Sequence, residues 1–494
     1  MPKSHLSSLS FCSIICLILL QPASLWAQVT PTDSNLPEET IPDTLIVEPP
    51  QFEMDFAADV GMSKIENSMG EKEQFFATAL MPEFYYGPYS AGLLLKMHLR
   101  IKEGSTRRED YDSFGDFLSI IRYVQYAEKG TYGTYARFGE LEETSLGFGQ
   151  FINFFNNSIS LDDQKRGFEV NYQTKDFLIE GIYSNVLAPE VFGLRGAYFP
   201  LTEDPLSKYK LVSVGVSLAG DLSNRGTLIN TEMPGAPFVV DDLTDVNGVR
   251  TAIGTDDGKL LMGGLDISMP VFLTETSSGL TYGEISKIFG HGMGIGIGFS
   301  GKWQLPDDLR TEIQLEQRFL GKEYIPNYFN SLYEALRLQT LGIPVDGQDD
   351  IEALNTQRNI LASQTKSRFG SFVTMAWRWK RAWRFRWSYE HAWNVKDSGW
   401  FHFDIRIKSP EFPIYLRLRF DQLKTTSLED LATTGNNLNF FRLETAIRVV
   451  RMLMVGISIR NSYEPDFHEG VPIGLKKRRR IEPKFVFVMP RKSK

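Results

Sequence analysis

The sequence predicts an all-β protein, a transmembrane antiparallel β-barrel of about 20 strands (18–22) with long extracellular loops. Three observations lead to this fold class. Residues 401–408 alternate without a break between apolar and ionisable side chains, and the same alternation recurs along the C-terminal part of the chain. No segment after residue 27 has the roughly 18 uninterrupted apolar residues that a membrane helix needs. Aromatic residues make up 13% of the chain and glycines number 41, which suits barrel strands with interfacial rings and a tightly packed lumen.

Repetition is what favours a barrel over a soluble sheet. In residues 401–408, four apolar side chains lie on one strand face and four ionisable ones lie on the other; 383–390, 442–449 and 453–460 show a similar two-sided pattern. In a soluble β-sandwich the apolar faces would need a second protein layer to cover them. Because some twenty such strands follow one another with no obvious domain break, we expect the apolar faces to contact lipid.

The first 27 residues have the features of a cleaved secretory signal. Lys3 precedes an apolar stretch at 11–20, and a small-residue site ends at Ala27. Because Cys12 and Cys16 both lie in this segment, the mature chain is expected to carry no thiol, which excludes disulfides, thiolate metal sites and cysteine nucleophiles. We therefore expect export to the outer membrane of a diderm bacterium.

Three further regions follow the signal peptide. Residues 28–50 are rich in Pro, Thr and acidic side chains and are predicted to be a disordered periplasmic leader. The barrel is predicted to span 51–490, and 491–494 form a short basic tail. Strands are expected near the following positions: 52–60, 74–84, 89–101, 117–127, 131–140, 166–173, 176–184, 191–199, 208–220, 260–272, 278–288, 292–303, 309–320, 369–379, 383–395, 399–409, 413–424, 437–449, 451–463 and 481–489.

The strand count also predicts which connections lie outside the cell. Bacterial barrels usually have an even number of strands, short periplasmic turns and longer outer loops. Alternate counting back from the C-terminus places the long connections 221–259, 321–368, 425–436 and 464–480 on one side. The rule of short periplasmic turns and longer outer loops holds in the N-terminal half only if residues 141–165 form one long outer loop. We prefer a position of this loop on the surface, and inward folding into the pore is the alternative.

Two segments carry a family resemblance. RYVQYAEKGTYGTYARFGELEETSLGFGQFINFFNNS (122–158) and LEQRFLGKEYIPNYFNSLYEALR (315–337) resemble blocks of a porin-like family of outer-membrane β-barrel proteins from diderm bacteria. The resemblance implies the fold and the compartment but no substrate or activity. The chain departs from the usual aromatic C-terminus of such barrels, because Phe485 and Phe487 are followed by a short polar tail.

A basic lumen wall is the clearest functional pattern. If the apolar faces contact lipid, the inward-facing residues of the C-terminal strands are mostly basic. They include Arg384, Arg386, Arg406, Arg417, Arg419, Arg442 and Arg448. Guanidinium rows along a water-filled passage concentrate anions and bind carboxylates or phosphates. The alternative, which carries equal weight, is that these arginines pair with acidic side chains and hold the lumen together.

A combined version places the acidic residues of loop 141–165 and its border opposite the arginines across a constriction. These residues are Glu140, Glu142, Glu143, Asp162 and Asp163. Separately, 328–340 and 349–364 have a helical pattern and are expected to form a cap, a plug or a partner surface. Acidic residues in 221–259 lack a calcium-loop register, so no metal site is predicted.

Catalysis has little support, and the protein is expected not to be an enzyme. No zinc-protease, nucleophile-elbow or phosphate-loop motif occurs, and no cofactor is indicated. A passive porin-like channel for small, anionic solutes is the preferred function. A closed barrel that serves adhesion or membrane assembly through its outer loops is the alternative, and an outer-membrane hydrolase using His402 ranks third. Expected partners are outer-membrane lipid, the barrel-assembly machinery and small solutes. The net charge of −8 argues against nucleic acid, and the oligomeric state stays open.

Overall fold

A computed structural model describes most of the region predicted to form the barrel. The described residues are 52–66, 72–107, 110–111, 114–130, 132–159, 165–202, 207–222, 244–246, 249–251, 259–336, 338–345, 348–356, 361, 364–380, 382–393, 395–396, 398–408, 412–425, 439–450, 452–468 and 471–488. The predicted signal peptide, periplasmic leader and basic tail lie outside them.

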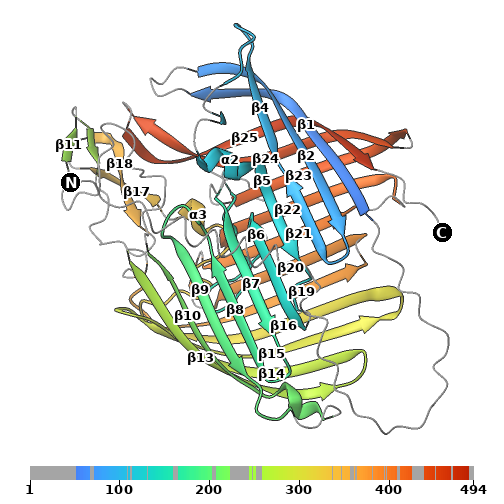
Figure 1. Ribbon diagram of the computed structural model, residues 1–494. Helices are drawn as coiled ribbons and strands as arrows, with labels where there is room; N and C mark the ends of the chain where they lie inside the picture. The colour runs from blue at the N-terminus through green and yellow to red at the C-terminus, as the bar shows by residue number, and fades with distance from the viewer. Residues whose placement is uncertain are drawn as a thin grey trace, which may run out of the picture. The chain divides into compact units, whose positions relative to one another are not determined.

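Strands dominate the described chain (Figure 1). They are β1 (Phe52–Glu66), β2 (Lys72–Tyr86), β3 (Tyr89–Leu93), β4 (Leu95–Arg100), β5 (Ile121–Tyr126), β6 (Gly133–Gly139), β7 (Gly167–Gln173), β8 (Phe177–Tyr183), β9 (Val191–Tyr198), β10 (Ser213–Asp221), β11 (Thr244–Val246), β12 (Val249–Thr251), β13 (Leu260–Leu273), β14 (Ser277–Ile288), β15 (Met293–Leu305), β16 (Leu309–Leu320), β17 (Leu338–Val345), β18 (Gln348–Thr356), β19 (Arg368–Trp379), β20 (Trp383–Ala392), β21 (Gly399–Ile407), β22 (Ile414–Thr425), β23 (Asn439–Val450), β24 (Leu453–His468) and β25 (Val471–Val488). Helical turns are α2 (Phe114–Ile120), η3 (Lys208–Leu211), η5 (Pro306–Asp308) and α3 (Tyr333–Leu336). Among the described residues, no helix has the length and apolar character to span a bilayer.

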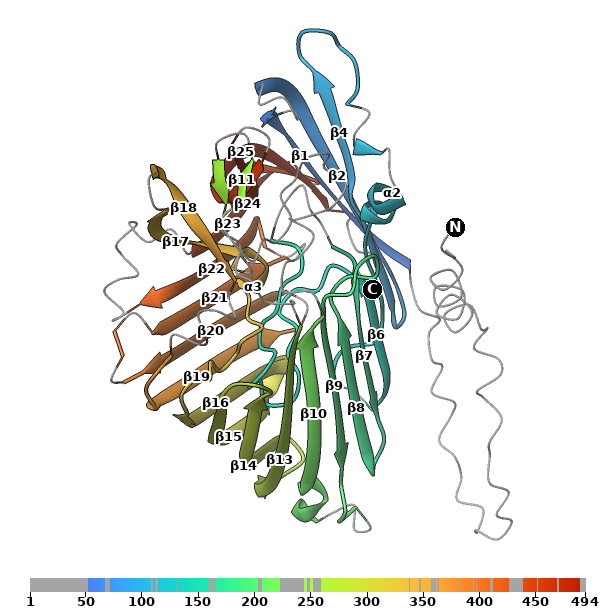
Figure 2. The same cartoon turned by 90° about the vertical axis from the view of Figure 1, so that its left-hand side faces the viewer.

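One antiparallel sheet closes on itself. It contains 21 labelled strands, in which each pairs with its neighbours along the chain and β1 pairs with β25. Since β3 and β4 both pair with β2 and are separated only by Leu94, they form one interrupted strand, and the barrel has 20. The predicted fold class is confirmed, and the strands lie near the predicted positions, except that 117–120 and 208–211, at the start of two expected strands, are helical. The closing strand, β25, completes the ring despite its polar tail (Figures 1 and 2).

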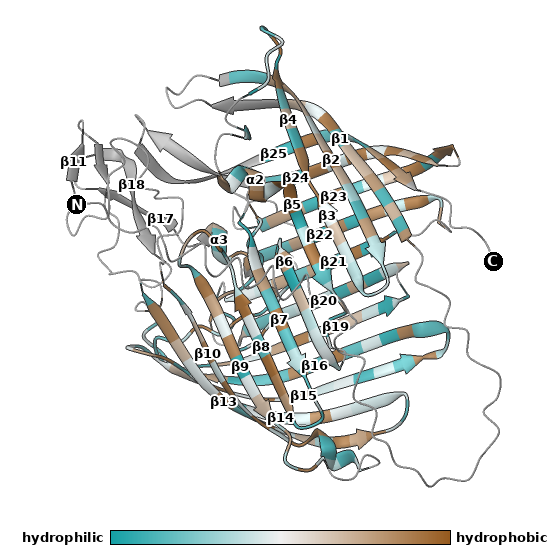
Figure 3. Ribbon diagram, viewed as in Figure 1, coloured by the Kyte–Doolittle hydropathy of each residue, from teal (hydrophilic) through white to brown (hydrophobic). Residues whose placement is uncertain are grey.

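Burial in this barrel is inverted relative to a soluble protein. Along β10, Val216 is 58% exposed, whereas the next residue, Ser217, is only 8% exposed. The same exchange occurs on β13, where Leu265 and Ile267 face outward and Asp266 is buried. Figure 3 shows this alternation of hydropathy along the strands. An exposed apolar surface of this extent needs lipid rather than water around it, because soluble proteins rarely expose contiguous apolar patches of more than a few hundred Å².

The helices expected at 328–340 and 349–364 are mostly wrong. Among the described residues of these two ranges, Tyr333–Leu336 and Leu361 are helical, whereas β17 and β18 form a separate two-stranded hairpin. Pro344 lies between the two expected helices and stops a helix from continuing past 340, since proline removes a donor and clashes inside a helix. In the sequence, Asp-Gly is a strong hairpin-turn pair, and at 346–347 this local signal competes with the helical spacing.

Candidate functional site

The connection between β6 and β7 lies inside the barrel. Leu141, Phe151, Ile152 and Phe155 are each at most 2% exposed. Gly147 and Gly149 have φ values of 57° and 95°, so the chain reverses tightly there in a conformation that glycine adopts readily. The preference for a surface position is therefore wrong for the described part of the loop. The apolar centre of the loop packs against other residues of the same chain, which removes its side chains from water.

A second segment from the long connection after β16 packs against this loop. Phe151 and Phe329 bond through their backbones, with Phe329 N donating to Phe151 O at 3.0 Å, and Tyr324 and Tyr333 join the same buried cluster. The cluster also includes Ile182 on β8, with further members on β9, β10, β13, β14 and β16. An apolar core therefore occupies the lumen beside these strands. We call the two inward segments, 140–159 and 321–336, the plug.

Two acidic residues of the plug meet the arginine rows. Arg417 Nη2 bonds both oxygens of Glu142 at 2.6 Å, and Arg442 Nη1 approaches Glu142 at 3.5 Å. Arg384 Nη2 bonds Glu143 at 2.7 Å. Each of the two carboxylates also contacts Arg406, at 3.3 Å from Glu142 and 3.1 Å from Glu143. Two of the five acidic residues considered, Glu142 and Glu143, thus form ion pairs with strands β20 to β23.

The remaining predicted site residues are placed differently. Arg386 contacts Glu143 at 3.2 Å and shares its carboxylate with Arg384. Arg419 is almost fully buried and bonds Asp421 at 2.8 Å rather than the loop. Arg448 lies at the end of β23, where Nη2 bonds the carbonyl oxygen of Phe412 at 3.1 Å. Glu140 is a lining residue of the cavities described below, and Asp162 and Asp163 lie outside the described residues.

Burial and guanidinium contacts act in opposite directions on the loop carboxylates. Burial disfavours the ionised form of Glu142, but Arg417, Arg406 and other guanidiniums outweigh it and hold the pKa of Glu142 well below its usual range. The pKa of Glu143 is also lowered: burial opposes ionisation, while Arg384 favours it. Both groups are therefore anionic at neutral pH. Their two negative charges offset part of the charge on the five arginines that they contact.

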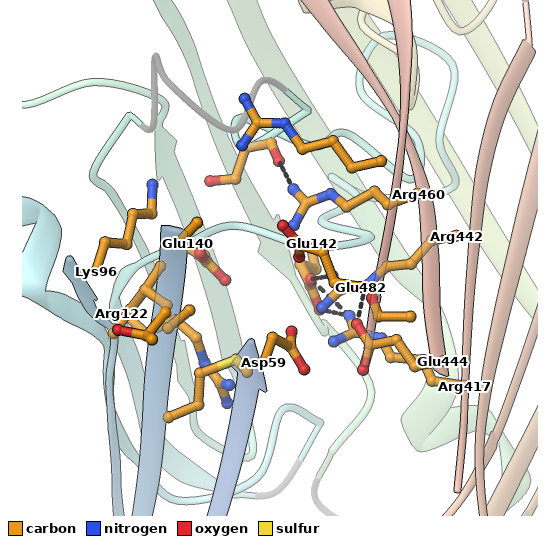
Figure 4. Close-up of a pocket in the computed structure, with 18 of the residues that line it drawn as sticks. Asp59, Lys96, Arg122, Glu140, Glu142, Arg417, Arg442, Glu444, Arg460 and Glu482 are labelled. Carbon is orange, nitrogen blue, oxygen red and sulfur yellow. Dashed lines mark hydrogen bonds and ion pairs between the residues drawn. The ribbon is translucent and has the colours of Figure 1, made fainter. Parts of the chain in front are cut away.

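Two adjoining cavities, of about 90 and 270 Å³, lie beside the plug. They share seven lining residues, among them Glu142, Arg417, Arg442 and Arg122, so they meet at the level where the loop contacts β22 and β23. Figure 4 shows Asp59, Arg122 and Glu140 facing the arginines of the red strands across the smaller cavity, whereas Glu142 contacts Arg417 directly. These two cavities thus lie between the plug and the first and last strands.

The lining of these cavities is basic in balance. Ten basic side chains contribute, namely Lys96, Arg122, Arg137, Arg406, Lys408, Arg417, Arg442, Arg460, Arg480 and Lys484. Seven acidic side chains oppose them, namely Asp55, Asp59, Glu83, Glu140, Glu142, Glu444 and Glu482. The excess of positive charge is modest, because most of the lumen arginines have a carboxylate partner.

His402 does not form a catalytic arrangement. Its Nδ1 lies 2.6 Å from Asp421 Oδ1, and its ring stacks on Phe154 at 4.7 Å. Ser331 Oγ donates to the same aspartate at 2.5 Å, so the hydroxyl is directed at a carboxylate rather than at the imidazole. In a Ser-His-Asp triad the hydroxyl bonds the imidazole, whereas this hydroxyl bonds the carboxylate. In the part of the chain that the structure describes, no group of His, Cys, Asp and Glu could hold a metal ion.

Sequence reasoning missed several lining residues on the first and last strands. Lys484 Nζ contacts Asp59 at 2.9 Å and Glu444 at 3.1 Å, while Lys408 and Arg122 both pair with Glu83. Alternation indicates Lys484, because it stands opposite Phe485 and Phe487 in a predicted strand. Nothing in the sequence indicates that Glu83 lies next to Lys408, 325 residues away.

Comparison with known proteins adds little. No protein-family model matches the chain, and no curated protein matches it. Solved structures of mutants of Rh. blastica porin are similar at 8% identity, over 69% of this chain and 94% of that chain, with a TM-score of 0.24. A triple mutant of Rhodopseudomonas blastica porin gives 9% identity over 69% and 94%, with the same score.

Scores this low carry no argument, so the fold rests on strand pairing and on the inverted burial. Twenty antiparallel strands, a closed ring and an apolar exterior define a porin-like barrel. This is the architecture of outer-membrane channels in general, and it suits an outer-membrane location.

Proposed function

We propose that the protein is a passive outer-membrane channel for small anionic solutes. Solutes would pass through the two cavities between the plug and the first and last strands. Lipid would cover the exposed apolar faces. The path is narrow, because the two cavities have volumes of only about 90 and 270 Å³ and the plug packs beside them. We therefore expect solutes of few atoms rather than oligomers.

One observation carries the proposal: ten basic and seven acidic side chains line the cavities. In a water-filled passage with low-dielectric walls, such an excess raises the local anion concentration. The pairing of Glu142 with Arg417 and Arg442 limits this effect, since paired charges produce a weaker field at a distance. The preference of the channel for anions over cations should consequently be moderate. The local anion concentration should be highest where basic side chains outnumber their acidic partners.

Reversal potentials in planar bilayers, under a KCl gradient, test this proposal. The parent should conduct with a preference for chloride, and Arg406→Ala and Arg417→Ala should each weaken the preference. Arg378→Ala is the matched control, because Arg378 pairs with Glu128 in a half-exposed position and does not line either cavity. A cation-selective parent, or equal effects of all three variants, would contradict the proposal.

A closed barrel is the second candidate, favoured by the extent of the buried apolar core of the plug. In that case the outer connections would serve adhesion or membrane assembly. Properly folded protein that stays electrically silent in bilayers would favour it. We propose no catalytic role: any lipase or protease activity of the parent should be unchanged in His402→Ala, and a loss in that variant would reopen the hydrolase hypothesis.

A further inference from the structure

Charges of both signs line the smaller cavity without forming ion pairs. Among the described residues, no cation pairs with the carboxylate of Glu140 or Glu482, and no carboxylate pairs with the guanidinium of Arg460. The neighbouring Arg417, in contrast, bonds Glu142 at 2.6 Å. A charge enclosed by protein is costly unless water or a partner stabilises it. The three unpaired groups therefore need either water or a ligand.

Glu140 is held at the junction of the two cavities. Its backbone N donates to the carbonyl oxygen of Arg122 at 2.8 Å, and its own carbonyl oxygen accepts from Arg137 Nε at 2.8 Å. These two bonds fix the start of the plug against β5 and β6. The residue is only 9% exposed, and it lines both cavities. A buried carboxylate is thus directed at cavity space rather than at a basic side chain.

Arg460 is the basic counterpart on β24. Its Nη2 reaches the carbonyl oxygen of Ser158 at 3.5 Å, which is the long limit of a hydrogen bond, and its Nε is buried with no partner among the described residues. Arg460 also stands directly opposite Arg442 on β23 and Arg480 on β25. Like charges opposite each other on neighbouring strands destabilise a sheet, so this row favours an anionic group beside it.

The smaller cavity separates these two unpaired groups. Figure 4 shows Glu140 and Arg460 on opposite sides of it. Glu140 is near enough to act electrostatically on Arg460, but the two side chains do not contact each other. The space between the walls, about 90 Å³, exceeds the roughly 10–15 Å³ that one water needs, and it adjoins the cavity of about 270 Å³. A solute of several heavy atoms therefore fits there.

The two walls select a solute that carries both charges. A simple anion would satisfy Arg460 but would meet the carboxylates of Glu140 and Glu482, and a simple cation would meet the arginine row. We propose that the smaller cavity binds a small zwitterionic amino acid, with its ammonium group at Glu140, its carboxylate at Arg460 and its side chain toward the larger cavity. Both ends would then form charge-assisted hydrogen bonds, which are among the strongest in proteins.

This inference goes beyond the proposed passage of anions and rests on it only for access, because the solute reaches the cavity along the lumen. A zwitterion has no net charge, so the basic excess of the lining neither attracts nor repels it as a whole. Selection depends instead on Glu140 and Arg460, which lie on opposite walls. Binding and conduction can therefore be measured separately.

Titration with L-alanine, followed by saturation-transfer difference NMR on the predicted mature chain in detergent micelles, tests the proposal. The parent should bind alanine saturably and more tightly than propionate or ethylammonium, each of which carries one of the two charged groups. Glu140→Gln should weaken alanine binding roughly tenfold or more and should not weaken propionate binding. Arg460→Gln should weaken the binding of both alanine and propionate.

Glu128→Gln and Arg378→Gln are the matched controls, because these two residues pair with each other outside both cavities. Both controls should bind alanine as the parent does, and Glu140→Asp, which keeps the charge, should retain most of the affinity.

Two results would overturn the amino-acid site: no saturable binding of alanine by the parent, or alanine binding that Glu140→Gln leaves unchanged. Equal binding of alanine and propionate by the parent would also overturn it and would indicate a site for simple anions. Conductance is a separate readout. A silent barrel that binds alanine would refute the channel and leave this site standing, whereas an anion-selective channel that binds no alanine would do the reverse.

Discussion

Replacement of Glu142 by glutamine should make the channel more selective for anions. Glu142 contacts Arg417, Arg406 and Arg442, and it lines both cavities. The substitution removes one of the seven acidic charges and leaves all ten basic ones. The amide oxygen of glutamine still accepts a hydrogen bond from Arg417, so the loop keeps one of its anchors.

The size of the effect follows from the cavity. An ion at the centre of the 270 Å³ cavity lies about 7 Å from a carboxylate on the wall, where one elementary charge is worth about 0.6 kcal/mol in water. Screening at 0.1 M salt, with a Debye length of about 10 Å, reduces this to about 0.3 kcal/mol. Because anions gain and cations lose by the same amount, the permeability ratio should rise about three- to sevenfold.

Reversal potentials measured for the parent, Glu142→Gln and Glu142→Asp provide the assay. The aspartate variant keeps the charge and should stay near the parent. Glu128→Gln, which removes a half-exposed carboxylate outside both cavities, should also stay near the parent. An unchanged ratio in Glu142→Gln, or a shift toward cations, would refute the placement of this carboxylate beside the ion path.

Three further predictions concern the plug, pH and the lipid face. Phe155→Ala removes a fully buried ring of the plug core and should cost roughly 3–5 kcal/mol of local stability. This loss should appear as a larger or noisier conductance. Phe177→Ala is the control: its ring is 52% exposed, so conductance should not change. The pKa values of Glu142 and Glu143 in the folded protein lie below the ordinary 4.5, so the stability that these groups contribute is complete above about pH 4.5 and is lost as the pH falls through the lower folded values. The thermal unfolding temperature should therefore not depend on these two groups between pH 7 and 4.5. A loss of stability above pH 4.5 that disappears in the Gln variants would contradict the pairing. Val216→Arg on the lipid face should destabilise the barrel by roughly 2–4 kcal/mol in urea unfolding from bilayers, whereas Val216→Leu should be nearly neutral.

Strands were predictable because their signal is local. Each spanning strand contacts lipid on one side and the lumen on the other, so the period of two appears in the sequence wherever the chain crosses the bilayer. The arginines of β20 to β23 follow from the same alternation. It places Arg384 and Arg417 inward but gives no indication that Arg419 pairs locally or that Arg448 bonds a turn carbonyl.

The plug had no such signal. Its position depends on contacts such as Gln150 Nε2 with Glu316 Oε1 at 3.2 Å, between residues 166 apart in the chain. A loop with an apolar centre and acidic ends is compatible with a surface position or with the lumen. The choice depends on whether the opposing walls supply apolar faces and guanidiniums at the right height.

The sequence by itself determined the barrel, its strand positions and the basic character of its C-terminal wall, because each of these follows from which solvent a residue faces. Only the tertiary structure decided that Glu142 and Glu143 pair with that wall, that the connection between β6 and β7 lies inside the barrel, and that two cavities lie beside the first and last strands. Those features depend on distances between residues far apart in the chain, and alternation along one strand carries no information about its partners across the lumen.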